Sequence, residues 1–468
     1  MTINWPGAAA WRKQAGARSK PRNSNMKNNK YTSAHCNPAL VLLALANIYA
    51  TTASAAMLGT TNAMSNLATN QQSATFLIKS LRLTYGNFDF HPRLSTAIVY
   101  NDNINLSGQH PQRDEISQVS PGLQIMGGDT HSLRTYIQES RLYNQFFDVG
   151  QINPLWLMAQ PVEKWPDKFL FLDYTAVWNN YMHYSANDSL DHRLNALAVW
   201  PMAKLVLAFR QEFVDAKEDI FVANTRTEVQ HIETALDAGY VINDDLNLGS
   251  TWGRQSYAYP NASSLTGYTE WKGLVSVNRN CFDTIRLGLE VAGGEDEITS
   301  GRNQQFVQTG ILVRYKCSEL FSIDGSAGLE YRQFDSGVPN AYNPYAALNV
   351  RYQPWDRLYV SADLVRQTIP DLLNNLGYYE NSISLALNKE ITDRFTLSTK
   401  VGYEHDESYS TDSSASSLPV NDYVNLGLVA EYKLEQRVTL QAAYSYYTLT
   451  DNTSWERNTI MLKMLLHF

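Results

Sequence analysis

The sequence predicts an all-β protein, a transmembrane antiparallel up-and-down β-barrel of about 20 strands, with about 18 as the alternative. Three observations carry this prediction: segments that alternate apolar and polar residues, tight-turn signals that recur along the chain, and longer polar loops between them. Alternation with a period of two places one set of side chains on each face of a strand. The tight-turn signals include Gly127-Gly128 and Trp165-Pro166, and the count of about 20 places a strand on each side of every turn after the first. The longer polar loops include Ile104–Ile116 and Asp215–Arg226. Short periplasmic turns and longer extracellular loops are typical of outer-membrane barrels.

The N-terminal part of the chain resembles an export signal. Residues 1–25 are basic, polar and without a pattern, whereas Met26 begins a short basic stretch that is followed by the apolar run 39–50 and by Ala53-Ser54-Ala55. A charged region, a short apolar region and a small-x-small site form a signal peptide. We therefore expect translation to start at Met26 and cleavage to occur near Ala55.

These observations divide the chain into three parts. Residues 1–55 are expected to be an N-terminal extension plus the cleaved signal peptide. Residues 56–80 are expected to be a flexible periplasmic lead-in, because they are rich in Thr, Asn, Ser and Ala. Residues 81–468 are expected to form a single transmembrane barrel.

Composition agrees with a barrel and excludes some other classes. The roughly 410 residues after the signal would suggest two or three soluble domains by length, yet the sequence has no linker and no sustained helical period. After the signal it also lacks an apolar run of about 18 residues, so no transmembrane helix is expected. The net charge of −8 argues against nucleic acid as a partner.

The alternating segments separate a barrel from other repeat folds. In the segment 394–404, Phe395, Leu397 and Val401 fall on one face, while Lys400 and Glu404 fall on the other. Turn signals about 35 to 39 residues apart could also indicate a solenoid or a propeller, but strand alternation between the turns favours a barrel. A soluble sandwich would need protected edges, and closure into one barrel removes the edges.

The segment 152–162 bears on the choice between about 20 and 18 strands. Pro154 and Pro161 argue against a regular strand there, because proline cannot donate a ladder hydrogen bond.

The C-terminal residues predict a closing strand. Every second residue back from the end is apolar, and the other set carries the charge. We interpret the apolar set as the lipid-facing side and as a C-terminal signal for the barrel-assembly machinery; an edge strand of a soluble sandwich is the alternative. The predicted assembly signal consists of Ile460, Leu462, Met464, Leu466 and Phe468.

Charged residues on the polar face are candidates to line the lumen. Both signs occur, with some excess of basic groups, which favours water and hydrated solutes and would suit an anionic polymer. The alternative is that most of them pair across strands and fill space. The candidates are Lys272, Arg286, Glu290, Arg314, Asp324, Glu330, Arg332, Arg351, Asp363, Lys400, Glu404, Arg457 and Lys463.

No catalytic, cofactor or metal site is predicted. The eight His that follow the signal are scattered and show no metal-ligand spacing with Cys or carboxylates. Asp102 with Asp114, or Asp406 with Glu407, could form a carboxylate pair at a rim, so a rim-active hydrolase is one alternative.

Two cysteines follow the signal, and they occupy equivalent turns. Cys281 and Cys317 lie in successive repeats on the predicted periplasmic side, where an oxidising environment favours a disulfide. Their turns are two strand spacings apart, roughly 10 Å, whereas a disulfide needs Cα atoms within about 7 Å. The disulfide would therefore require the turns to lean together.

Several motifs carry a resemblance to a known family. Pro92–Ile104, Val119–Leu123, Phe169–Trp178 and Asn187–Leu194 resemble segments of the type 2 outer-membrane β-barrel porins found beside exopolysaccharide gene clusters. The second half matches only as a run of hairpins, and Asn144–Lys164 departs from the family pattern, which leaves the strand count open. The resemblance implies a conduit for secreted polysaccharide.

Together these features lead us to expect an outer-membrane pore, a passive conduit for exopolysaccharide or other hydrated solutes. A structural barrel with a blocked lumen is the alternative. The expected partners are outer-membrane lipid and lipopolysaccharide, the barrel-assembly machinery and components of polysaccharide secretion.

The signal peptide gives the first testable prediction. N-terminal sequencing of the protein from isolated outer membranes should begin close to residue 56, because the small-x-small site ends at Ala55. A mature protein that begins at Met1 or Met26 would contradict it.

Overall fold

The computed structural model describes residues 83–128, 168–220, 223, 225–282, 284–299, 303–318, 320–335, 340–370, 377–408, 420–450 and 454–468. The expected extension, start at Met26, cleavage near Ala55 and lead-in lie outside the described residues. The described strands all belong to one compact unit of the chain, which lies within Tyr49–Phe468.

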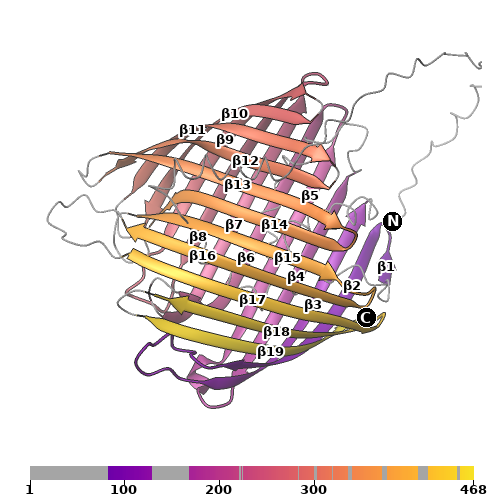
Figure 1. Cartoon of the computed structure of the whole chain (residues 1–468), viewed down its shortest axis with the longest axis vertical. Helices are drawn as coiled ribbons and strands as arrows, with labels where there is room; N and C mark the ends of the chain where they lie inside the picture. Colours follow the sequence, from indigo (N-terminus) through magenta and orange to yellow (C-terminus); the bar gives the residue numbers. More distant parts are fainter. Residues whose placement is uncertain are drawn as a thin grey trace, which may run out of the picture. The chain divides into compact units, whose positions relative to one another are not determined.

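The described residues form one antiparallel sheet that closes on itself (Figure 1). Each strand from β2 onward pairs with the next in the chain, and β19 pairs with β2. The strands are β1 (Leu83–Tyr85), β2 (Phe88–Asn101), β3 (Asp114–Gly128), β4 (Phe169–Tyr181), β5 (Ser189–Pro201), β6 (Leu205–Ile220), β7 (Thr225–Val241), β8 (Leu246–Ala258), β9 (Tyr268–Phe282), β10 (Ile285–Ile298), β11 (Gln304–Ser318), β12 (Phe321–Phe334), β13 (Ala341–Trp355), β14 (Leu358–Ile369), β15 (Tyr378–Glu390), β16 (Phe395–Ser408), β17 (Val420–Glu435), β18 (Val438–Leu449) and β19 (Trp455–His467).

The predicted barrel is confirmed with eighteen strands, β2 to β19, so the count of about 20 is wrong and the alternative of 18 is right. The extra hairpin was expected between the turn signals at Gly127-Gly128 and Trp165-Pro166. Instead β3 pairs directly with β4, from Gly128 opposite Phe169 to Ile116 opposite Tyr181. The ring therefore has β3 and β4 as direct neighbours, and residues 129–167 lie outside the described part.

The connections on the two rims differ in length. On one rim, which we call the turn rim, only two residues separate β13 from β14 and β17 from β18. On the other, the loop rim, the segments 102–113 and 409–419 join β2 to β3 and β16 to β17. Short periplasmic turns and longer extracellular loops follow from this asymmetry, with the long connection from Gly128 to Phe169 as the exception on the turn rim.

The ring closes where β19 meets β2, a junction we call the seam. Pairing runs from Thr459 opposite Asn101 to His467 opposite Arg93, and the Phe468 N–H donates to the Pro92 carbonyl at 3.1 Å. The short strand β1 pairs with Phe88–Phe90 of β2 beyond the seam, after a turn in which Gly86 has a φ of 61°. β1 therefore pairs with the part of β2 that extends beyond Phe468, so less of the β2 edge is left without a hydrogen-bonded neighbour.

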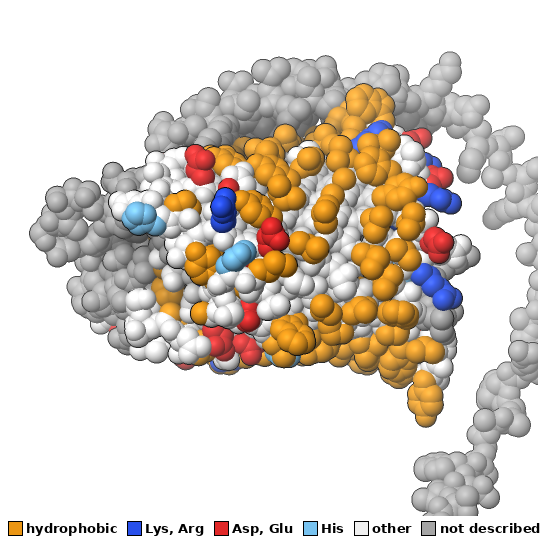
Figure 2. Space-filling model, turned by 90° about the horizontal axis from the view of Figure 1, so that it is seen from below, with side chains coloured by type: hydrophobic (Ala, Val, Ile, Leu, Met, Phe, Trp, Pro, Cys, Tyr) orange, Lys and Arg blue, Asp and Glu red, His pale blue; other side chains and the backbone are white. Residues whose placement is uncertain are grey.

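The two faces of the wall differ in the way expected for a membrane. On β19, Ile460 and Leu462 are 49% and 62% exposed, whereas the alternate residues Met461 and Lys463 are buried. Figure 2 shows apolar side chains spread over the outer face of the barrel, with charged side chains mainly towards its two ends. A soluble sandwich would bury this apolar face, so that alternative is wrong.

The described part of the chain contains no helix long and apolar enough to cross a bilayer.

One region of the inner wall depends on two facing glycines. Gly328 of β12 lies opposite Gly310 of β11 and Tyr345 of β13. The Tyr345 side chain extends across both glycines, and its hydroxyl donates to Glu290 of β10 at 2.9 Å. A Cβ at Gly328 would collide with the Thr309 carbonyl and with the Tyr345 ring, so glycine is required for this crossing.

This geometry predicts the effect of Gly328→Ala. The added methyl group must displace Tyr345 from Glu290, and overpacking of this kind costs about 1–3 kcal/mol. The midpoint of thermal unfolding in detergent should fall. Gly253→Ala is the control, because a Cβ there would meet only the Thr234 carbonyl at 3.8 Å. Equal midpoints for the two variants would contradict this account.

Candidate functional site

The lumen is the candidate functional site, because charged side chains gather on the inner face of the wall. All thirteen residues named as lumen candidates occur in strands, on the face opposite the exposed apolar residues. Glu330, Arg332, Lys400 and Glu404 are almost completely buried. Charged side chains survive such burial when they are paired or hydrogen-bonded.

Two buried ion pairs show how the inner wall is satisfied. Arg93 of β2 donates to both oxygens of Asp173 on β4, at 3.0 and 2.6 Å, across the intervening strand β3. Near the loop rim, Arg332 donates to Glu330 at 2.8 Å and also to Asp296. Removal of either partner would leave a buried charge unpaired, which is strongly destabilising. We therefore treat these contacts as fixed parts of the wall.

A basic group lies nearer the turn rim on β10 to β13. Arg286 lies directly opposite Arg314, and Arg314 lies opposite Asp324. The Asp324 carboxylate bonds to Arg314 and lies 3.6 Å from Arg351. The Asp324 carboxylate is thus shared by two guanidinium groups, and a third guanidinium, that of Arg286, lies on the neighbouring strand. Positive side chains therefore outnumber negative ones in this group.

An acidic group lies on the inner face of β15 and β16, nearer the loop rim. Glu380 is directly opposite Asp406, and Glu404 is two residues from Asp406 on the same face. All three are buried, and Gln367 donates to Glu380 at 3.0 Å. The lumen wall therefore has a basic region towards one rim and an acidic region towards the other.

The segment between β2 and β3, residues 102–113, turns into the barrel; we call it the inner loop. Leu106 is 2% exposed and belongs to an apolar cluster with Tyr447, Leu449 and Trp455. These three residues lie on β18 and β19, across the seam from β2. Leu106 has a φ of 50°, an uncommon conformation for a residue with a side chain. The inner loop thus occupies part of the lumen near the loop rim.

Hydrogen bonds to β19 hold the inner loop in this position. The Asn458 backbone N–H donates to Asp102 Oδ1 at 2.6 Å, and the Asn458 side chain donates to Oδ2 at 2.8 Å. Asn103 donates from its side chain to the Glu456 carbonyl at 2.8 Å and to the Ser107 carbonyl at 3.1 Å. The loop is fixed at its base by both amide and carboxylate groups.

A second feature narrows the same part of the lumen. Asp219, near the end of β6, pairs with Arg226 at 2.8 Å and also with Arg457 of β19. In the ring, β6 and β19 are separated by β2 to β5, so this contact spans non-neighbouring strands. The Arg226 guanidinium also lies 5.6 Å from the centre of the Tyr181 ring of β4. We call Asp219, Arg226 and Arg457 the lumen bridge.

Sequence reasoning missed both the inner loop and the lumen bridge. The segment Ile104–Ile116 was expected to be an extracellular polar loop, and Asp215–Arg226 likewise. The second expectation is wrong, because β6 continues to Ile220 and β7 begins at Thr225. The apolar residues Ile104 and Leu106 in an otherwise polar loop were the signal that the first loop packs inside.

The carboxylate pairs proposed for catalysis are not assembled. Asp102 bonds to Asn458, whereas Asp114 accepts hydrogen bonds from the backbone of His183 and Tyr184. Asp406 is buried and Glu407 is exposed, as adjacent strand residues on opposite faces must be. In the described ranges, no group of three or more His, Cys, Asp or Glu could hold a metal ion.

The possible disulfide between Cys281 and Cys317 is not formed in the structure, in which Cys281 is a free thiol. Cys281 belongs to β9 and Cys317 to β11, with β10 paired between them. Two strand spacings separate the cysteines by roughly 10 Å, beyond the Cα distance of about 7 Å that a disulfide requires.

The fold and the two faces define the class of protein. A closed barrel pairs its strands without a free edge, which is one of two ways in which a chain can span a bilayer. Its outer face is apolar, its inner face is charged, and its turns and loops are on opposite rims. The chain is therefore a β-barrel protein of the bacterial outer membrane.

Comparisons with known proteins add little to this conclusion. No family model and no curated protein sequence matches the chain. The solved structure of OpdL from Pseudomonas aeruginosa is 10% identical, with a TM-score of 0.42, and the alignment covers 82% of this chain and 99% of OpdL. OccAB4 from Acinetobacter baumannii is 11% identical, with a TM-score of 0.42 and coverages of 82% and 99%. Likenesses this distant do not bear on the function of this chain, and the association with exopolysaccharide clusters stays a hypothesis.

The lumen bridge predicts the effect of Asp219→Ala. This change leaves Arg226 and Arg457 facing each other in a buried site, and loss of one partner of a buried ion pair costs roughly 3–5 kcal/mol. The temperature at which the folded band converts to the unfolded band in SDS gels should fall clearly. Asp393→Ala is the matched control, because Asp393 pairs with Arg357 but is 84% exposed. If both variants convert at the wild-type temperature, the bridge does not stabilise the barrel.

Proposed function

We propose that the chain is a passive outer-membrane pore for hydrated anionic solutes, with secreted exopolysaccharide as the favoured cargo. The observation that carries this proposal is the basic group of Arg286, Arg314 and Arg351 on the inner wall towards the periplasmic rim. Guanidinium groups bind carboxylates and phosphates well, because their donors form a planar fork.

The size of the ring supports a pore. Barrels of 16 to 18 strands generally leave an aqueous channel rather than a core filled with side chains. A lining with charges of both signs favours water and hydrated solutes. We infer that the thirteen charged lumen candidates line this channel, although the deeply buried ones, such as Arg332 and Glu330, act mainly by holding the wall rigid.

Exopolysaccharide is favoured because the lumen chemistry and the sequence resemblance agree. A polymer with carboxylate groups would meet the basic group first when it enters from the periplasm. Components of polysaccharide secretion on the periplasmic side are the expected partners, together with the barrel-assembly machinery and outer-membrane lipid.

A barrel with a blocked lumen is the second candidate. The inner loop and the lumen bridge favour it, because both occupy the lumen near the loop rim. In that case the protein would be structural, or would open only when the inner loop moves.

The first experiment is conductance of the purified, refolded protein in a planar bilayer. Large and steady current steps would support an open pore. A folded, heat-modifiable barrel without conductance would contradict the passive pore and favour the blocked lumen.

The basic group predicts the ion selectivity of the pore. Arg286→Gln combined with Arg314→Gln should reduce the ratio of anion to cation permeability severalfold, because it removes two inner charges and leaves Asp324 with Arg351. Reversal potentials in a salt gradient measure this ratio. Arg279→Gln is the matched control: Arg279 lies opposite Leu287 at a similar height, but it is exposed on the outer face. Unchanged selectivity in the double variant would rule out this group as the anion site.

A further inference from the structure

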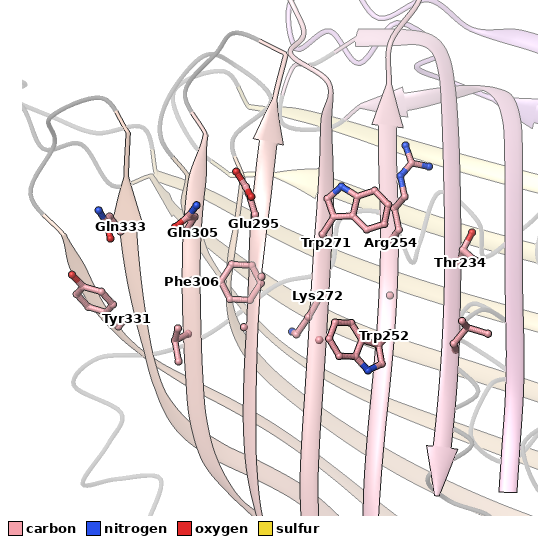
Figure 3. A pocket seen from close by; sticks show the side chains of 16 residues that line it. Thr234, Trp252, Arg254, Trp271, Lys272, Glu295, Gln305, Phe306, Tyr331 and Gln333 are labelled. Atoms are coloured by element: carbon pink, nitrogen blue, oxygen red, sulfur yellow. The ribbon is translucent and has the colours of Figure 1, made fainter.

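The outer face of the barrel contains a hollow of about 770 Å³ that spans β7 to β12 (Figure 3). Its floor is made by Gly273 of β9 and Gly293 of β10, which lie directly opposite each other. Residues of odd number face outward on both strands, so two adjacent outward positions carry no side chain. The wall is therefore thin at this place; we call the hollow the glycine groove.

Large apolar side chains form the walls of the glycine groove. Trp252 is 66% exposed, and its ring lies over Gly273, where an added Cβ would meet the ring at 3.3 Å. Trp271 lies above Trp252 towards the loop rim, and Tyr331 lines the other side (Figure 3). Val307 is paired between Gly293 and Tyr331 and lines the same side. The groove can hold an apolar chain against flat aromatic surfaces.

The groove lies at the border between the apolar band and the polar rim. Towards the turn rim it continues into Val275, Val291 and Leu289, all more than half exposed. Towards the loop rim it ends at a row of polar residues that includes Arg254 and Glu295. Tryptophan and arginine at such a border are typical of the membrane–water interface, and the loop rim places this border in the outer leaflet.

Arg254 gives the groove its charge complementarity. Its guanidinium lies 5.3 Å from the centre of the Trp271 ring, which fixes it at the polar end of the groove. Glu295 is two strands away, roughly 10 Å along the same row. An anionic headgroup at Arg254 would therefore not contact the carboxylate directly.

We propose that the glycine groove binds one acyl chain of a phosphorylated outer-leaflet glycolipid of the lipopolysaccharide class, with a phosphate at Arg254. The outer face in the bilayer must be covered by lipid, and here the surface recedes over the two glycines, between Trp252 on one side and Tyr331 on the other. The phosphate accepts hydrogen bonds from the guanidinium. This binding site depends on the membrane location and not on the proposed pore function, so each can fail without the other.

Native mass spectrometry of the protein extracted from outer membranes in mild detergent tests the proposal. The wild-type protein should retain a glycolipid adduct. Gly293→Leu should lose it, because the leucine fills the groove; the substitution is compatible with the fold, since a Cβ at Gly293 would meet only the Phe306 carbonyl, at 3.5 Å. Arg254→Gln should retain severalfold less lipopolysaccharide when the delipidated protein is titrated with it.

Two controls separate the groove from general effects of outward substitutions. Ala327→Leu adds bulk to the exposed outer face of β12 outside the groove, and Arg279→Gln removes another exposed outward cation. Both should retain the adduct and the titration curve of the wild type. Heat modifiability establishes that each variant is folded.

Three outcomes would overturn the proposal. The first is a wild-type adduct that Gly293→Leu keeps unchanged. The second is a wild-type protein that binds phosphatidylethanolamine vesicles as strongly as lipopolysaccharide. The third is a dimer that Gly293→Leu dissociates, which would mean that a second copy of the chain occupies the groove.

Discussion

Complete pairing of the backbone is the constraint on which the rest of the structure depends. In a bilayer an unpaired N–H or carbonyl costs several kcal/mol, so a sheet must close. The seam between β2 and β19 satisfies this requirement to the last residue, since the Phe468 N–H bonds to Pro92. β1 then pairs with β2 beyond the end of the chain. Once the ring is closed, each strand has a defined lipid face and a defined lumen face.

The lumen face follows from this closure, because charges enclosed by the wall must find partners within it. Arg93 reaches Asp173 across one strand, and Tyr345 reaches Glu290 across two glycines. The contact from Asp219 to Arg457 crosses a larger part of the ring. These contacts stiffen the wall and narrow one end, while the basic group lies nearer the other rim.

The fold was predictable from the sequence because strand alternation is local. Residues such as Phe395 and Lys400 show their faces without any knowledge of neighbouring strands. The strand count was harder to predict. The turn signals at Gly127 and Trp165 do not reveal whether a hairpin lies between them, because the same turn residues would occur in either case. The inner loop and the lumen bridge were not predictable, since Leu106 and Asp219 meet partners far away in the sequence. The glycine groove was also missed: Gly273 and Gly293 become a surface feature only when the register aligns them.

The seam has a consequence for biogenesis. It joins residues 93–101 to residues 459–467, so the first and last strands of the barrel can pair only after the whole chain has been made. Contacts that are so distant in sequence form slowly, because a long loop must close first. Until then the nascent sheet has two open edges that can pair with other chains. Ribosomes that stop early therefore release a product whose edges never meet, and such fragments should depend on periplasmic chaperones and proteases for their removal.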